Sequence, residues 1–258
     1  MAIPVTDLSN LNLAVLIDAD NAPRTMIRNI MQEIAIYGTP TVKRIYGDWT
    51  SPNLGSWKMA LLENAITPVQ QYSYTTGKNS TDSAMIIDAM DILYSGHVGG
   101  FVIVSSDSDF TRLATRIRES GLRVIGIGEK KTPAPFIASC DKFIYVELIR
   151  SKYQEQDEQK AEPKPRRSTK RGAEYPPIPP ETVRLIADSV SDIADDDGWA
   201  FLGELGNLLI KKQPDFDPRN FGFSKLTPLV RSLPRFEIDV RQTGDANTKH
   251  IYVRDKEA

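Results

Sequence analysis

The stretch LNLAVLIDADN, residues 11–21, decides the fold, because an unbroken apolar run leads directly into aspartate and asparagine. A run that is apolar at odd and even positions alike is typical of a strand buried on both faces of a parallel sheet. The stretch GFVIVSSDSDF, residues 100–110, has the same form and also ends in acidic side chains. The two stretches predict two strands of one sheet, with aspartates at their carboxyl ends.

Strands and helices alternate through the first 150 residues. Apolar runs at 41–48, 66–72, 122–128 and 142–148 predict four further strands, and the segments between the strands have helical spacing. We therefore predict an α/β domain over residues 1–150, with a doubly wound, mostly parallel sheet.

The last 80 residues have a different pattern. Helical spacing at 181–195, 199–212 and 223–233 is followed by a predicted hairpin at 236–254 that turns at Gly244-Asp245. Three helices and a hairpin predict a small winged-helix (α+β) domain over residues 180–258.

A charged, proline-rich segment separates the two predicted domains. Residues 151–179 contain almost no aliphatic side chains, and such a composition buries too little apolar surface to offset the entropy of ordering. We predict a linker there. Its basic cluster is either a solvated part of this linker or a mobile phosphate-binding arm.

The composition excludes a chain that is disordered throughout and a fibrous protein. The chain has 258 residues, of which 40% are hydrophobic and 26% charged, and its formal charge of -2 excludes neither nucleic acid nor protein partners. Cys140 is the single cysteine and cannot form an intramolecular disulfide. No apolar run is long enough for a membrane span, and the first residues lack a signal pattern, so we expect no membrane contact and a cytoplasmic location.

Acidic side chains cluster where ligands bind to parallel sheets, outside the carboxyl ends of the strands. One aspartate at each strand end would suffice to cap the next helix, but the first and fourth strands offer at least two carboxylates each. Repelling carboxylates that lie close together favour a bound cation, and oxygen ligands select Mg²⁺ or Mn²⁺. The predicted metal ligands are Asp18, Asp82, Asp107 and Asp109, with Asn21 holding a phosphate oxygen or a water.

Two further acidic residues follow Asp82 on its predicted helix. Asp88 lies about 240° around the helix from Asp82, so the two carboxylates cannot enter one metal site. For Asp88 and Asp91 we predict solvent exposure or hydrogen bonds to a neighbouring element.

Three motifs in the first domain resemble those of the NYN domain, a branch of the PIN-like nucleases that includes the LabA-like proteins. They are D-x-x-N at Asp18–Asn21, the segment that runs from Lys78 through Asp82 to Asp88, and S-x-D-x-D-F at Ser105–Phe110. The resemblance covers about residues 10–150. It implies a PIN-like fold and a metal-dependent ribonuclease whose catalytic residues are Asp18, Asn21, Asp82, Asp107 and Asp109. Lys78 and Ser105 are the predicted substrate-binding residues, and Trp49, Trp57, Tyr72 and Tyr74 would suit base stacking, although packing is the more frequent role of such side chains.

The second domain resembles the LOTUS domain, also called OST-HTH. The resemblance rests on D-G-W-A-F-L-G-E-L-G at Asp197–Gly206 and on D-x-R-N-F-G-F-S-K-L at Asp217–Leu226. It implies binding of RNA or docking of a protein partner. From their spacing, we predict that Trp199 and Phe201 belong to a helix and face the core.

Three functions follow from these patterns. The first is a ribonuclease that uses Mg²⁺ or Mn²⁺ and receives RNA through its second domain. The second is a non-catalytic adaptor that binds RNA or proteins. The third is phosphomonoester transfer, because Asp18-Ala19-Asp20 has the D-x-D spacing of haloacid-dehalogenase-like phosphatases, although Asn21-Ala22-Pro23 fits the nuclease pattern better.

Overall fold

The computed structural model describes residues 11–72, 80–160, 177–242 and 249–258, with the backbone alone for 154–160. The chain divides into two compact units, Met1–Pro163 and Lys164–Ala258, which we call unit 1 and unit 2. Within the described residues, no helix is both long enough and apolar enough to cross a lipid bilayer.

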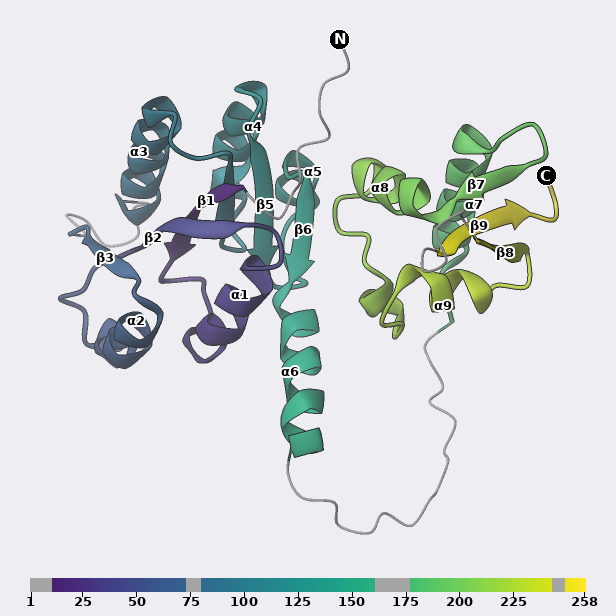
Figure 1. Cartoon of the computed structure of the whole chain (residues 1–258). Coiled ribbons are helices and arrows are strands. Elements are labelled where there is room, and N and C mark those ends of the chain that lie inside the picture. Colours follow the sequence, from purple (N-terminus) through teal and green to yellow (C-terminus); the bar gives the residue numbers. More distant parts are fainter. Residues whose placement is uncertain (1–10, 73–79, 161–176, 243–248) are drawn as a thin grey trace. The chain divides into compact units, whose positions relative to one another are not determined.

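Unit 1 contains a six-stranded sheet with the order β3-β2-β1-β4-β5-β6, and every neighbouring pair is parallel. This sheet confirms the predicted doubly wound α/β fold (Figure 1). Along the chain, β2 and β3 follow on one side of β1, and β4, β5 and β6 then follow on its other side. The strands are β1 (Asn12–Asp18), β2 (Thr39–Gly47), β3 (Thr67–Gln70), β4 (Gly100–Val104), β5 (Arg123–Gly128) and β6 (Lys142–Tyr145).

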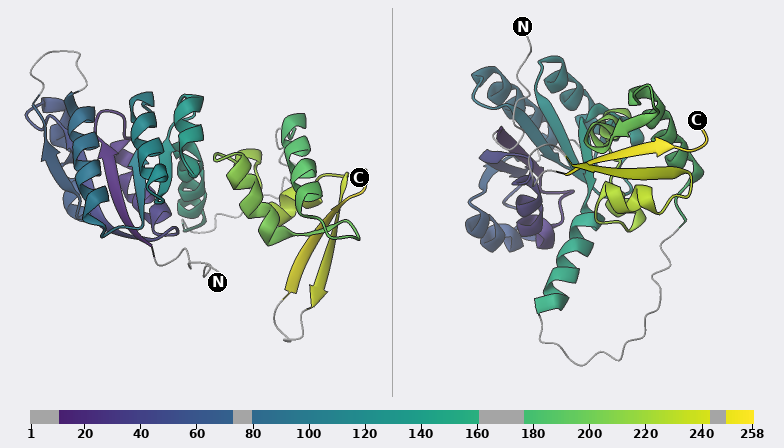
Figure 2. Two further views of the ribbon diagram at one scale, coloured as in Figure 1. Left: turned by 90° about the horizontal axis from the view of Figure 1, so that it is seen from above. Right: turned by 45° about the vertical axis from the view of Figure 1, so that its right-hand side comes forward.

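Helices cover both faces of this sheet, and the view from above in Figure 2 shows them alongside the strands. Residues of β1 alternate between the two cores: Val15 and Ile17 face one, and Ala14 and Leu16 face the other. One layer contains η2 (Arg24–Met26), α1 (Ile27–Ile34), η3 (Pro52–Trp57), α2 (Lys58–Asn64) and α6 (Val146–Lys160). The other contains α3 (Ser80–Ser95), η4 (Ser108–Phe110), α4 (Thr111–Glu119) and α5 (Ala134–Ser139).

The end of unit 1 differs from the sequence-based expectation. β6 stops at Tyr145 and α6 follows at once, so the predicted strand at 142–148 was too long and the predicted linker start at 151 is wrong. Ile149 is fully buried in the core, and Lys152 Nζ lies 2.7 Å from Glu33 Oε2 on α1. These contacts anchor the first turns of α6, and the glutamine-, glutamate- and lysine-rich residues that follow are good helix formers. Residues 161–176 of the predicted linker lie outside the described residues.

Unit 2 has helices packed on one face of a three-stranded antiparallel sheet with the order β7-β9-β8, as expected for the small α+β domain. Its core contains Ile186, Val190, Leu205 and Leu209 from the helices and Val253 from the sheet. The predicted turn at Gly244-Asp245 lies outside the described residues. The elements are α7 (Pro180–Ile193), β7 (Trp199–Phe201), α8 (Leu202–Lys212), η5 (Pro218–Phe221), α9 (Leu226–Arg231), β8 (Phe236–Gln242) and β9 (Lys249–Asp255).

One expectation for unit 2 was wrong. Trp199–Phe201 form the short strand β7, whereas their spacing had predicted the start of a helix. Gly198 adopts a φ of 79°, and Asp195 Oδ1 accepts a 2.7 Å hydrogen bond from the Trp199 backbone N–H. This turn directs the chain into pairing with β9, and helix α8 starts only at Leu202.

Candidate metal centre

The candidate site lies at the carboxyl ends of β1 and β4, where the strand order reverses. Ile17 pairs with Val104 in the parallel ladder, so the chain leaves the two strands side by side at Asp18 and Ser105. Crevices at such reversal points are where doubly wound sheets bind ligands. The sheet topology therefore brings the two strand ends that carry the predicted carboxylates side by side.

Asp18 is 1% exposed and is surrounded by hydrogen-bond donors. Its Oδ2 accepts from Asn21 Nδ2 at 2.7 Å and from Ser105 Oγ at 2.8 Å, and its Oδ1 accepts from the Asp20 backbone N–H at 3.0 Å. Asn21 therefore orients Asp18. A buried carboxylate with these partners is poorly placed to act as the nucleophile of a phosphatase.

Ser105 links the two strand ends. Its buried hydroxyl donates to Asp18 and accepts a 3.1 Å hydrogen bond from the Asp107 backbone N–H. The side chain thus fixes the path of the loop after β4 relative to β1. A direct contact between Ser105 and a substrate stays a prediction, and Lys78 lies outside the described residues.

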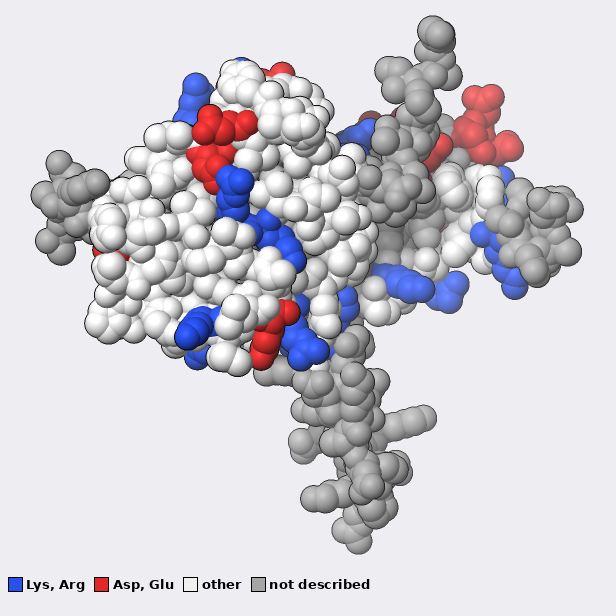
Figure 3. All heavy atoms as spheres, turned by 60° about the vertical axis from the view of Figure 1, so that its left-hand side comes forward, with Lys and Arg blue, Asp and Glu red and all other residues white. Residues whose placement is uncertain are grey.

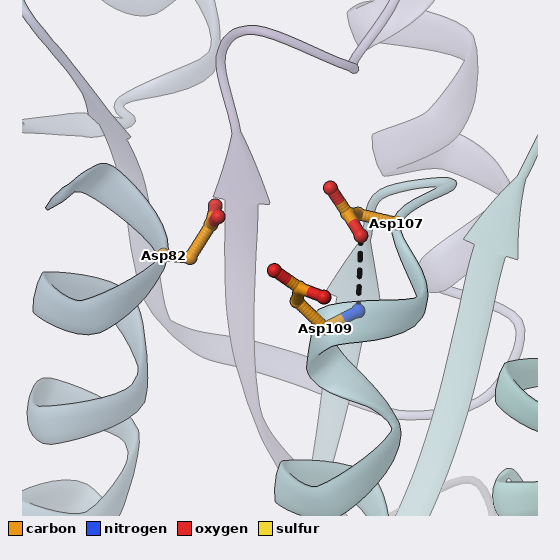
Figure 4. Close-up of side chains that lie close together, drawn as sticks. All are labelled: Asp82, Asp107 and Asp109. Carbon is orange, nitrogen blue, oxygen red and sulfur yellow. Dashed lines mark hydrogen bonds between the residues drawn. The ribbon is translucent and has the colours of Figure 1, made fainter. Parts of the chain in front are cut away.

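Three carboxylates converge beside these strand ends. Figure 4 shows Asp82, from the first turn of α3, pointing towards Asp107 and Asp109 of the loop and short helix after β4. One oxygen from each of the three lies within 4.8 Å of the others. Asp107 also caps η4, because its Oδ1 accepts a 2.9 Å hydrogen bond from the Asp109 backbone N–H.

The donor set of this group fits a hard cation. All three side chains offer carboxylate oxygens, which suit Mg²⁺ or Mn²⁺ better than the softer metals that select cysteine or histidine. Asp18 is not a member of the three-residue group, although it lies close enough to affect Asp82 electrostatically. Direct ligation by Asp18 therefore stays a prediction.

Burial and neighbouring negative charge both disfavour the ionised form of Asp82. The pKa of Asp82 is raised from 3.8 to about 6, mainly by burial and then by the negative charges of Asp18, Asp107, Asp109 and Asp20. Burial, together with the charges of Asp18 and Asp48, also raises the pKa of Asp20. The part of these shifts that comes from surrounding negative charge is the part that a bound cation would relieve.

Asp88 lies outside this group, as its helical angle predicted. Its carboxylate accepts hydrogen bonds from Arg44 and from the hydroxyl of Tyr46, both on β2. The Tyr46 side chain is fully buried. Asp88 therefore attaches α3 to the sheet and holds the helix that carries Asp82.

The tryptophans that were candidates for base stacking have structural roles. Trp57 is 3% exposed in the core, and Trp49 packs partly against the same core and donates from Nε1 to the Val69 carbonyl at 2.9 Å. Tyr72 is 55% exposed, whereas Tyr74 lies outside the described residues.

Two features of the site had not been predicted. Asp48, at the carboxyl end of β2, contributes negative charge near Asp20, and the strand-end rule applied to β2 would have found it. The β5 loop is tied to the site by the Glu129 backbone N–H, which donates to Ser106 Oγ at 2.9 Å. A Cβ atom on Gly128 would lie 2.6 Å from the Ser105 carbonyl oxygen, so glycine permits this close approach of the two loops.

Figure 3 shows the side of unit 1 that lies on the left in Figure 1. On that face, lysine and arginine form small groups among uncharged residues and near acidic ones. The visible described residues there do not form one continuous basic surface. Charge at this face therefore does not mark out one ligand-binding surface.

Two family models match the chain and confirm both resemblances. The NYN domain model matches residues 12–148, which is more than half of the 258 residues, and the OST-HTH/LOTUS domain model matches residues 178–247. No curated protein matches the chain.

Two solved structures are similar to this chain over part of its length. A crystal structure of a protein of unknown function from Vibrio parahaemolyticus is 18% identical, with a TM-score of 0.46, over 56% of this chain and 96% of that chain. A solution structure of an uncharacterized protein from Nitrosomonas europaea is 33% identical, with a TM-score of 0.29, over 37% of this chain and 92% of that chain.

Proposed function

The chain belongs to the NYN domain family, and from this premise we propose that unit 1 is a ribonuclease that requires Mg²⁺ or Mn²⁺ and hydrolyses RNA phosphodiester bonds. The observation that carries the proposal is the convergence of Asp82, Asp107 and Asp109, whose oxygens lie within 4.8 Å of one another. Unit 2, which matches the OST-HTH/LOTUS model, would bind the RNA.

Each residue of the site has a distinct part in this proposal. Asp82, Asp107 and Asp109 would hold the cation. When bound, it would activate a water molecule and neutralise the charge that develops on the phosphate. Asp18 adds negative charge near Asp82, and Asn21 and Ser105 keep its carboxylate in place.

A cleavage assay tests this proposal. Labelled single-stranded RNA is incubated with the purified protein in Mn²⁺, in Mg²⁺ or in EDTA, beside Asp107→Asn and the control Asp91→Asn. Asp91 is an exposed residue of α3 outside the three-carboxylate group, so its variant should cleave as the wild type does. We expect cleavage with either cation, none in EDTA, and none from Asp107→Asn.

Asp18→Asn provides a graded comparison. If Asp18 acts through the residues around the cation, its amide variant should lose about 10- to 100-fold in rate, as is usual for partners of metal ligands. Cleavage that persists in EDTA and in folded Asp107→Asn would refute the proposal that this site is a metal-dependent nuclease. Tight RNA binding without cleavage under any condition would instead identify an adaptor.

A further inference from the structure

The sheet of unit 2 has one face that its core does not use. Ala200, Ile238 and Val253 point into the core or pack against it, and the residues that alternate with them occupy the opposite face. β7, β9 and β8, which carry this face, are labelled in Figure 1. We call it the outer sheet face; its residues are Trp199, Phe201, Glu237, Asp239, Arg241, His250, Tyr252 and Arg254.

Four of the eight residues of the outer sheet face carry aromatic rings, and the other four are charged. Trp199, Phe201 and Tyr252 are partly exposed, and none of them belongs to the hydrophobic cluster that stabilises the described part of unit 2. The Phe201 ring lies 5.8 Å from Tyr252 and 5.2 Å from the ring of His250, measured between centroids. Packing in the hydrophobic core therefore does not explain why these positions are aromatic.

Two arginines lie over the rings. The guanidinium carbon of Arg241 is 4.2 Å from the centroid of the Tyr252 ring and 5.3 Å from that of Trp199. The guanidinium carbon of Arg254 is 4.7 Å from the centroid of the Trp199 ring. Planar guanidinium groups and aromatic rings are the two kinds of side-chain surface on which unpaired bases stack.

Each arginine is oriented by a neighbouring carboxylate. Arg241 Nε lies 2.9 Å from Asp239 Oδ2, and one terminal nitrogen of Arg254 lies 2.7 Å from Glu237 Oε2. The two acidic side chains are 45% and 46% exposed. Carboxylates beside a stacking surface can accept hydrogen bonds from the amino groups of bases.

We propose that the outer sheet face binds single-stranded RNA by stacking unpaired bases on the layer that Trp199, Tyr252 and the guanidinium of Arg241 form together. This inference rests on the proposed function, in that it takes RNA to be the ligand of the chain. Two carboxylates balance the two arginines, so binding at this face depends on the bases more than on the phosphates. A duplex, whose bases are already stacked and paired, binds much more weakly than a single strand.

Fluorescence anisotropy in EDTA, with the full chain and a short labelled RNA, tests this proposal without cleavage. The Trp199→Ala/Tyr252→Ala double variant should bind the single strand about 100-fold more weakly, since each ring accounts for about 10-fold. Tyr252→Phe keeps the ring and should bind as the wild type does. Tyr94→Ala, which removes a 72% exposed tyrosine of unit 1, is the matched control.

A second measurement covers the case in which the double variant does not fold. RNA should quench tryptophan emission in the wild type, and this change should disappear in Trp199→Phe, which retains Trp49 and Trp57. Quenching that is unchanged in Trp199→Phe would overturn the proposal. Undiminished binding by the folded double variant, or equal affinity for the duplex, would also overturn it and would leave the face to a protein partner.

The two proposals fail in different ways. If only the nuclease proposal is wrong, RNA binding in EDTA is weakened by the ring variants, but no cleavage occurs in Mn²⁺ or Mg²⁺. If only the stacking proposal is wrong, the protein cleaves RNA in a metal-dependent way, and the ring variants do not change its affinity for RNA.

Discussion

Replacing Asp82 by asparagine should stabilise the metal-free protein at pH 8. The pKa of Asp82 is raised from 3.8 in its ordinary state to about 6 in the folded chain, by burial first and by four neighbouring aspartates next. Folding therefore disfavours the charged form. The stability associated with this group is fully present below pH 4 and is lost as the pH rises through 6.

The size of the effect follows from the pKa change. A rise from 3.8 to about 6 corresponds to an upper limit of about 3 kcal/mol. The Asp82 side chain is only partly buried, so solvent screening leaves about 1–1.5 kcal/mol. For a folded unit of this size, that gain raises the melting temperature by about 3–5 °C.

Thermal unfolding in EDTA, followed by circular dichroism at pH 8 and at pH 4.5, measures the difference. Asp82→Asn should melt higher than the wild type at pH 8, and the difference should shrink at pH 4.5, closer to the ordinary pKa of 3.8. Asp91→Asn, on the exposed side of the same helix, should change neither value. Adding Mn²⁺ should raise the melting temperature of the wild type more than that of Asp82→Asn, because only the wild type retains all three carboxylates.

Two results would refute this reasoning. One is an Asp82→Asn protein that melts at or below the wild-type temperature in EDTA at pH 8. The other is an equal gain at pH 4.5, which would trace the stabilisation to something other than the charge of Asp82.

Three further substitutions test how the site is supported, each by urea unfolding. Gly128→Ala should cost about 1–3 kcal/mol, because the new Cβ would lie 2.6 Å from a backbone oxygen of the site; wild-type stability would contradict this. Asp88→Ala should cost about 1–3 kcal/mol by removing the acceptor of the buried Tyr46 hydroxyl, and an unchanged midpoint would argue against this role. Lys152→Ala should cost roughly 2–3 kcal/mol by removing the ammonium beside the buried Glu33 carboxylate, with Lys152→Arg closer to wild type, and equal losses in both variants would point to another cause.

The strands of unit 1 could be predicted because their signals are local. Residues 13–17 are apolar at consecutive positions, and this pattern requires burial on both sides whichever strands lie beside them. The acidic strand ends were predictable for a related reason, since the carboxyl ends of parallel strands meet at one edge of the sheet.

The errors arose where tertiary contacts decide the conformation. The charged residues after 150 have the composition of a linker, yet the contacts of Ile149 and Lys152 anchor a helix that continues through Lys160. Trp199 and Phe201 have helical spacing, but pairing with β9 places them on a strand facing away from the core.

By itself, the sequence determined the order and type of most elements and which carboxylates follow the strands, because burial patterns and residue chemistry are properties of short segments. Only the tertiary structure decided which of those carboxylates form the three-residue group and which one is buried beside it. Asp18 is buried and hydrogen-bonded to Asn21 and Ser105, whereas Asp82 meets Asp107 and Asp109 across the end of the sheet. The physical reason is that this division depends on how α3 packs on β2, through a contact between Asp88 and Tyr46 that are 42 residues apart in the chain.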